Sequence, residues 1–241
     1  MFSVINKRGK EVFTQSLAKF LMLFGLCLLP SISQAELPTF DSRFKASRDL
    51  NKIFHRPDII GASVSAGFIT ESPGDRAASR YTSKENINHQ VRWGAEGKEF
   101  TFISPAWAKQ YSIIIGVDFL FWDSTLSDPT ESIRALKNLV SSAARAGVPL
   151  VLGDIPQLQL LFYRQTTRDL LNKQIHSACK VKNGCYVIPL DRLHQQAETE
   201  GIVVGGQRYF YRDMTFEGLH LNDFGSEYVA RLILRLLKGR S

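Results

Sequence analysis

The chain contains 241 residues with a mass of 27.2 kDa, a length that suits one domain of ordinary size. Hydrophobic residues make up 44% and charged residues 22% of the sequence, which is typical of a packed soluble domain and excludes collagen-like, coiled-coil and largely disordered chains. No internal repeat of about 20 to 50 residues is visible, which also excludes solenoid and propeller architectures.

The first 35 residues have the layout of a secretory signal peptide. Four basic residues precede an apolar run from Phe20 to Leu29, and Ser33-Gln34-Ala35 follows it. The run is shorter than the roughly 20 residues that a membrane-spanning helix needs. We therefore expect cleavage after Ala35, export to the periplasm or the medium, a single domain over residues 36–241 and no transmembrane anchor.

The composition of the remaining chain argues against several kinds of partner. Without residues 1–35 it holds 26 Lys and Arg against 22 Asp and Glu, and it lacks a motif of interleaved basic and aromatic residues, so no nucleic-acid partner is expected. Cys179 and Cys185 form an even pair in an exported chain, which predicts a local disulfide. The histidines follow no metal-ligand spacing, and no metal or organic cofactor is expected.

The apolar pattern along the chain predicts an α/β domain. Short, nearly continuous apolar runs are typical of parallel strands that are buried on both faces. They cover residues 58–62, 100–103, 111–117, 148–153 and 185–190. Helical periodicity separates them at residues 130–145, 166–178 and 191–200, and the clearest helix closes the chain at residues 224–238. The polar stretch of residues 69–99 is predicted to be a functional loop region with some helix.

Two segments carry residues that suit nucleophilic catalysis. Ser63 follows the first predicted strand, at the carboxyl end where open α/β sheets build their sites. Glu217 and His220 stand three residues apart, just before the last helix. A serine hydroxyl needs a neutral imidazole to take its proton, and a carboxylate holds that imidazole in the right tautomer. Each segment alone is a weak signal, but together they offer a nucleophile, a base and an acid.

The order and spacing of these segments resemble the SGNH, or GDSL-like, hydrolase family over most of residues 57–238. The matching segments are Gly61-Ala62-Ser63 with Gly67, residues 113–116, residues 147–153, and residues 218–222 followed by Gly225. The resemblance implies a three-layer, flavodoxin-like fold with a central parallel sheet. It also implies ester hydrolysis without a cofactor, with Ser63 as the nucleophile and His220 as the general base.

The sequence departs from the family pattern in its acidic residues. Ala62 stands where the family's first motif has Asp. Glu217 replaces the Asp of the D-x-x-H motif, and Asp213 is a possible substitute in the same loop. Asp118 aligns with the Asn whose amide would donate to the oxyanion. Because an ionised carboxylate only accepts hydrogen bonds, three accounts stay open: Asp118 is protonated, it points elsewhere while another donor serves, or the protein is not a hydrolase.

Other residues near these motifs suit either a functional or a structural role. Gly94 and Gly97 are candidates for the family's oxyanion glycine, and Asp118 and Asp123 equally suit the bracing of a loop. Aromatic clusters could line an acyl pocket or cover the site as a lid, although aromatic residues belong mainly to cores. They comprise Phe119, Phe121 and Trp122 for the pocket, and Tyr209, Phe210 and Tyr211 for the lid.

The expected function is an exported serine esterase or lipase that cleaves a carboxylic ester in a small molecule, a lipid or a glycan. Two alternatives remain. The same acyl-enzyme could pass an acyl group, such as acetyl, to or from a cell-envelope polysaccharide. A non-catalytic domain of this fold could instead bind a glycan or a lipid, as the carboxylate at Asp118 would allow.

Overall fold

A computed structural model describes residues 48–67, 70–160 and 162–238, all of which lie in one compact unit. The predicted signal peptide and its cleavage site at Ala35 lie outside these residues. Across the described part of the chain, none of the helices is both long and apolar enough to cross a membrane.

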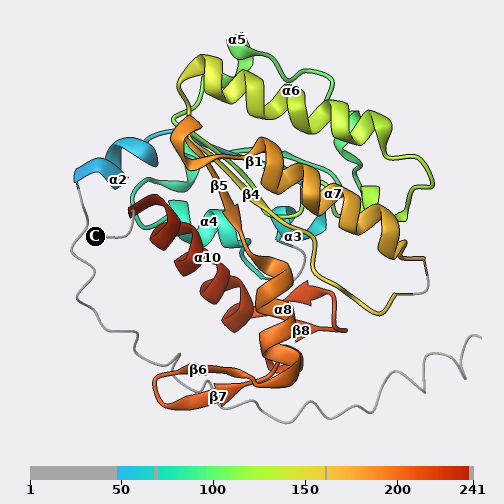
Figure 1. The fold of residues 1–241 in the computed structure, drawn as a ribbon. Coiled ribbons are helices and arrows are strands. Elements are labelled where there is room, and N and C mark those ends of the chain that lie inside the picture. Colours follow the sequence, from blue (N-terminus) through green and yellow to red (C-terminus); the bar gives the residue numbers. More distant parts are fainter. Residues whose placement is uncertain (1–47, 68–69, 161, 239–241) are drawn as a thin grey trace, which may run out of the picture. The chain divides into compact units, whose positions relative to one another are not determined.

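A five-stranded parallel sheet forms the centre of this unit, in the order β2-β1-β3-β4-β5 (Figure 1). Its strands are β1 (Pro57–Gly61), β2 (Asn88–Val91), β3 (Ile113–Gly116), β4 (Leu150–Gly153) and β5 (Cys185–Ile188). All residues of β1, β3 and β4 are buried, as expected of strands that are covered on both faces.

Helices cover both faces of the sheet and complete three layers. The α-helices are α2 (Arg48–Ile53), α3 (Ser63–Ala66), α4 (Pro73–Ala78), α5 (Pro105–Ala108), α6 (Thr130–Ala146), α7 (Gln165–Ala178), α8 (Leu190–Thr199), α9 (Tyr211–Met214) and α10 (Asp223–Lys238). One core cluster joins the sheet to α5, α6 and α7, and another joins it to α2, α4 and α10 (Figure 1). Neighbouring residues of β1 alternate between them, since Ile60 belongs to the first and Ile59 to the second. The predicted three-layer α/β fold is confirmed.

One predicted strand is wrong and one real strand was missed. Residues 100–103 form no strand, because Phe100 and Ile103 are buried in the core between short helices, and burial alone explains their apolar character. The edge strand β2 lies instead inside the region predicted to be a loop. Among the described strands it pairs only with β1. Its polar sequence, Asn-His-Gln-Val, stays partly exposed and so carries no apolar run to detect.

The chain after β5 builds two small hairpins and the closing helix. β6 (Ile202–Val204) pairs with β7 (Gln207–Tyr209), and β8 (Thr215–Phe216) pairs with β9 (His220–Leu221). The predicted last helix is confirmed as α10, with Val229, Ala230 and Ile233 buried against the sheet. The predicted disulfide between Cys179 and Cys185 is also confirmed, and it closes the short connection from α7 to β5.

Candidate active site

The candidate site lies at the carboxyl ends of β1 and β3. These strands are neighbours although they are not consecutive in the chain, and ligands of open α/β sheets bind at this kind of topological switch point. Ser63 follows β1 as the first residue of the short helix α3, and Asp118 follows β3. Both side chains are buried.

His220 reaches this edge of the sheet from the opposite end of the chain. It pairs with Phe216 in the β8–β9 hairpin, which fixes the backbone on either side of the turn. Asn222 anchors the end of the hairpin, since its backbone N–H donates to Met214 O at 3.0 Å and its side-chain amide donates to Asp213 O at 2.9 Å. The imidazole is therefore held by a hairpin rather than by an open loop.

The structure brings Ser63 and His220 into direct contact. His220 Nε2 lies 3.2 Å from Ser63 Oγ, although 157 positions separate the two residues. The His220 side chain is only 12% exposed, which shields the pair from most of the solvent. A neutral imidazole at this distance can accept the hydroxyl proton, and the pair thus has the geometry of an activated nucleophile.

The acidic partner of His220 is less closely held. Glu217 Oε2 lies 4.0 Å from His220 Nδ1, beyond hydrogen-bond length, and the Glu217 side chain is 72% exposed. Glu217 also has a φ of 55°, a left-handed conformation that costs a non-glycine residue roughly 1 kcal/mol. The other candidate, Asp213, accepts a hydrogen bond from Phe210 N–H at 2.8 Å and so caps its own helix.

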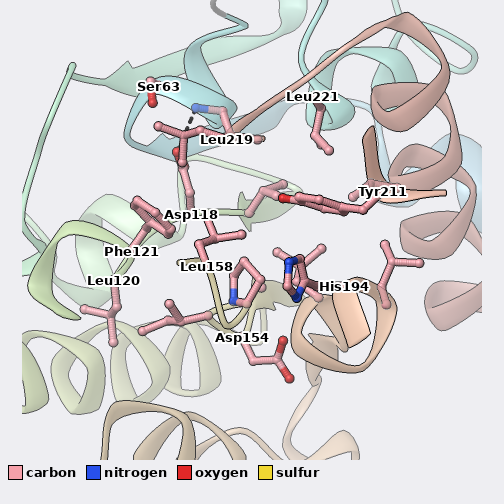
Figure 2. Close-up of a pocket in the computed structure, with 18 residues that line it drawn as sticks. Ser63, Asp118, Leu120, Phe121, Asp154, Leu158, His194, Tyr211, Leu219 and Leu221 are labelled. Atoms are coloured by element: carbon pink, nitrogen blue, oxygen red, sulfur yellow. Dashed lines mark hydrogen bonds between the residues drawn. The ribbon is translucent and has the colours of Figure 1, made fainter. Parts of the chain in front are cut away.

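Asp118 braces the turn that carries Ser63 (Figure 2). Its Oδ1 accepts hydrogen bonds from Ala62 N–H at 2.9 Å and from the Ser65 hydroxyl at 2.6 Å, and its Oδ2 accepts one from Val64 N–H at 2.7 Å. Gly61 makes this approach possible, because a Cβ at that position would lie 2.5 Å from Asp118 Oδ1. Asp118 is thus an acceptor for the turn.

Burial and hydrogen bonding shift the pKa of the Asp118 carboxyl in opposite directions. Burial raises its pKa above the ordinary value, and the hydrogen bonds from Ser65, Val64 and Ala62 oppose this increase only in part. Both oxygens already face donors of the turn, so the side chain does not occupy the donor position of the family's Asn. Of the three accounts left open by the sequence, this geometry matches the one in which Asp118 points elsewhere.

The two candidate oxyanion glycines differ in their surroundings. Gly97 N–H donates to both carboxylate oxygens of Asp123, at 3.0 and 2.9 Å, and a Cβ on Gly97 would lie 2.5 Å from the side chain of Leu120. Gly94 has a φ of 65° and open space around the position of a Cβ. Burial raises the pKa of Asp123 to about 6. Asp118 and Asp123 therefore both brace backbone, which is one of the roles that the sequence left open for them, and Gly94 is the candidate with open space around its Cβ position.

A mainly apolar pocket of about 50 Å³ opens beside Ser63 (Figure 2). Leu120, Phe121, Leu158 and Leu219 contribute to its walls, so the predicted aromatic lining holds for Phe121. The other two aromatic residues of that cluster lie elsewhere. Phe119 packs in the core against Phe100, and Trp122 stacks on Phe162.

Sequence reasoning missed the polar end of this pocket. His194, from α8, lines it although nothing in the sequence around this histidine signals a site. Tyr211 also lines the pocket and is the member of the predicted lid that does so, because Tyr209 stacks on Phe224 and Phe210 lies beside Arg212. Among the described residues, no three His, Cys, Asp or Glu side chains cluster as a metal site would require.

Comparisons with known proteins find a likeness only at the level of the fold. No protein-family model matches the sequence, and no curated protein matches it either. A lipase/acylhydrolase from Enterococcus faecalis is similar in structure, with a TM-score of 0.53 and 16% identity over 77% of this chain and 96% of that chain.

Two further solved structures show the same likeness. The psychrotrophic esterase EstA from Pseudoalteromonas sp. has a TM-score of 0.51 and 13% identity over 76% of this chain and 97% of its own. Protein YxiM from Bacillus subtilis has a TM-score of 0.51 and 16% identity over 76% of this chain and 56% of its own. The chain therefore has the SGNH/GDSL-like hydrolase fold, as the resemblance of its motifs led us to expect.

Proposed function

We propose that this protein is an exported serine esterase that cleaves carboxylic esters through Ser63 and His220. The observation that carries the proposal is the 3.2 Å contact between Ser63 Oγ and His220 Nε2 beside a mainly apolar pocket. The names of two structural neighbours, a lipase/acylhydrolase and an esterase, support the same reaction class. The disulfide between Cys179 and Cys185 supports export, because such bonds persist in oxidising compartments.

In the proposed reaction, Ser63 Oγ attacks the ester carbonyl carbon and His220 Nε2 takes the hydroxyl proton. The tetrahedral intermediate collapses when the bond to the alcohol oxygen breaks and His220 returns the proton to that oxygen. Water then attacks the acyl-serine with His220 again as the base, which releases the acid and restores the Ser63 hydroxyl.

The developing oxyanion needs donors that are not already engaged. The N–H groups of Ala62 and Val64 donate to Asp118, and that of Gly97 donates to Asp123. Gly94, in its open left-handed turn, remains the backbone candidate from the sequence. Loss of one oxyanion donor typically costs about 10² to 10³ in rate, so this site is expected to be a slower catalyst than one that also has a side-chain amide.

A fluorophosphonate probe tests the proposal without a choice of substrate. We expect the intact mass of the mature protein to increase by one adduct, and the Ser63→Ala variant to stay unlabelled, because only an activated serine attacks the phosphorus. The matched control is Ser132→Ala, which removes a buried serine from α6. An adduct that persists in Ser63→Ala, or no adduct on folded wild-type protein, would reject the proposed function.

Replacing Asp118 by Asn tests whether the carboxylate braces the turn. An amide keeps one acceptor oxygen but brings an NH₂ group against the N–H of Val64 or of Ala62, where two donors would meet. A buried donor that loses its partner costs about 1 to 3 kcal/mol. We expect labelling by the fluorophosphonate to slow by about tenfold to 100-fold, with a lower melting temperature.

The opposite outcome has a clear meaning for the site. Faster labelling of Asp118→Asn would show that the new amide turns toward the oxyanion and that the brace is dispensable. Asp123→Asn serves as the matched comparison, since it places an amide against Gly97 N–H in place of a carboxylate but leaves the turn of Ser63 intact.

A further inference from the structure

The pocket beside Ser63 ends in polar side chains. Ser63 lies at one side of the pocket, and His194 and Tyr211 lie toward the other, with apolar walls such as Leu158 between them (Figure 2). Figure 2 shows the ring of Tyr211 reaching into the pocket with its hydroxyl end foremost. An apolar ligand segment that starts at Ser63 would therefore meet His194 and Tyr211 where the apolar lining ends. The buried carboxyl of Asp154 also lines the pocket, but it already accepts a hydrogen bond from a backbone N–H at 2.8 Å.

His194 has an unused hydrogen-bonding atom at this place. Its Nδ1 is buried and finds no hydrogen-bond partner among the residues that the structure describes. Its Nε2 lies 4.0 Å from Glu198, and its ring packs edge-on against Tyr211 with 4.4 Å between the centroids. A buried polar atom without a partner costs about 1 to 3 kcal/mol, which a ligand that bonds to it would recover.

Burial also sets the charge state of both side chains. It lowers the pKa of His194 and raises the pKa of Tyr211, so both are neutral at pH 7. A neutral imidazole has one donor and one acceptor nitrogen, and a phenol both donates and accepts. This pair consequently suits a neutral hydrogen-bonding group rather than an anion.

A larger groove of about 470 Å³ continues beyond these two residues and shares Leu158, His194 and Tyr211 with the pocket. Its remaining walls are mostly amide, hydroxyl and carboxylate side chains, including Gln157, Gln159, Gln195, Glu198, Thr199 and Glu217. Among the described residues that line it, none is Lys or Arg. Two carboxylates without a cation disfavour a phosphate or a free carboxylate there.

The position of His220 decides which part of an ester enters the pocket, provided that the proposed function holds. His220 must reach the leaving alcohol oxygen, yet it lines a separate small cavity with Gly67 and Thr70 instead of the apolar pocket. The alcohol therefore departs on that side of Ser63, and the acyl group extends into the apolar pocket toward His194.

We infer that the acyl group of the substrate is apolar next to the ester and ends in a neutral hydroxyl or amide that bonds to His194 and Tyr211. His194 is then a specificity-determining residue, and esters of plain alkyl acids are the poorer ligands. Sites that bond to a polar substrate group discriminate strongly against the analogue that lacks it, because the protein groups are left unpaired.

Binding to the Ser63→Ala variant tests this inference apart from turnover. The probes are ethyl 6-hydroxyhexanoate and ethyl 8-hydroxyoctanoate, each compared by calorimetry with its unsubstituted counterpart. We expect at least one hydroxylated ester to bind about tenfold more tightly than its counterpart. His194→Phe, combined with Ser63→Ala, is expected to abolish this preference while keeping an aromatic ring against Tyr211.

Two further variants test whether the effect of His194→Phe comes from the lost hydrogen bond or from a change in the structure. His194→Gln retains a hydrogen-bonding group and is expected to keep part of the preference, whereas His55→Phe alters an exposed histidine before β1 and should leave it unchanged. Equal binding of both ester types, no binding of any, or a preference that survives His194→Phe would overturn the inference. A preference in binding without turnover by the wild type would reject only the proposed function, and turnover without a preference would reject only the inference.

Discussion

The His220→Ala variant is expected to lose about 10⁴-fold in kcat for ester hydrolysis, with little change in KM. His220 Nε2 lies 3.2 Å from Ser63 Oγ, so its removal leaves the hydroxyl without the base that accepts its proton. General-base catalysis contributes about 10² to 10⁴, and loss of a histidine that acts together with a nucleophile reaches the upper end of that range or beyond. Steady-state kinetics with a short-chain ester measures the loss.

Glu217→Gln is expected to lower kcat by less than about tenfold. The carboxylate is 72% exposed and 4.0 Å from His220 Nδ1, and an exposed ion pair contributes only about 0 to 1 kcal/mol. His55→Ala is the matched histidine control, since His55 is exposed and precedes β1, whereas Ser63 follows that strand. If Glu217→Gln were as damaging as His220→Ala, the carboxylate would have to close on the imidazole when substrate binds, contrary to the loosely held pair described above.

The extent to which the sequence predicted the fold follows from the burial of each element. Strands β1, β3, β4 and β5 and helices α6, α7 and α10 all bury apolar faces, and their residue patterns show it. β2 was missed because an edge strand pairs on one side only and needs no apolar run. Residues 100–103 were wrongly predicted to form a strand. Phe100 and Ile103 are apolar because they pack in the core, not because they belong to a sheet.

The sequence likewise predicted some residues of the candidate site and not others. Ser63 and His220 could be predicted because nucleophilic chemistry restricts the residue types, and their positions at the end of β1 and before α10 fit the fold. The direction in which Asp118 points could not be predicted, because it depends on the close approach between its carboxyl and the turn that Gly61 permits. His194 had no signal at all: an amphipathic helix can carry a histidine toward solvent, core or pocket equally well.

A buried carboxyl far from this chemistry has a large expected effect on stability. Asp58, the second residue of β1, is fully buried, and neither carboxyl oxygen has a hydrogen-bond partner among the described residues. Burial raises its pKa from 3.8 to about 7, although the nearby charge of His89 opposes the shift. The folded protein therefore holds Asp58 protonated over a pH range in which the unfolded chain releases that proton.

The sign of the pH dependence follows from proton binding. Between about pH 4 and pH 7 the native state binds more protons at Asp58 than the unfolded state, so the free energy of unfolding falls as the pH rises. The difference between a pKa of 3.8 and one of about 7 corresponds to roughly 4 kcal/mol. Asp58→Asn removes this titration, and its free energy of unfolding relative to wild type is expected to increase by about 4 kcal/mol from pH 4 to pH 8.

Urea unfolding of both proteins at several pH values measures that difference, in which the titrations of all other groups largely cancel. Glu131→Gln is the control, because Glu131 pairs with Arg134 on the exposed side of α6 and should change the pH dependence by less than about 1 kcal/mol. His89→Gln removes the charge that favours ionised Asp58, so it should raise the pKa of Asp58 in the folded protein further and extend the loss of stability to higher pH. A difference between Asp58→Asn and wild type that stays constant with pH would mean that Asp58 is hydrated or paired in solution, and that β1 tolerates its charge.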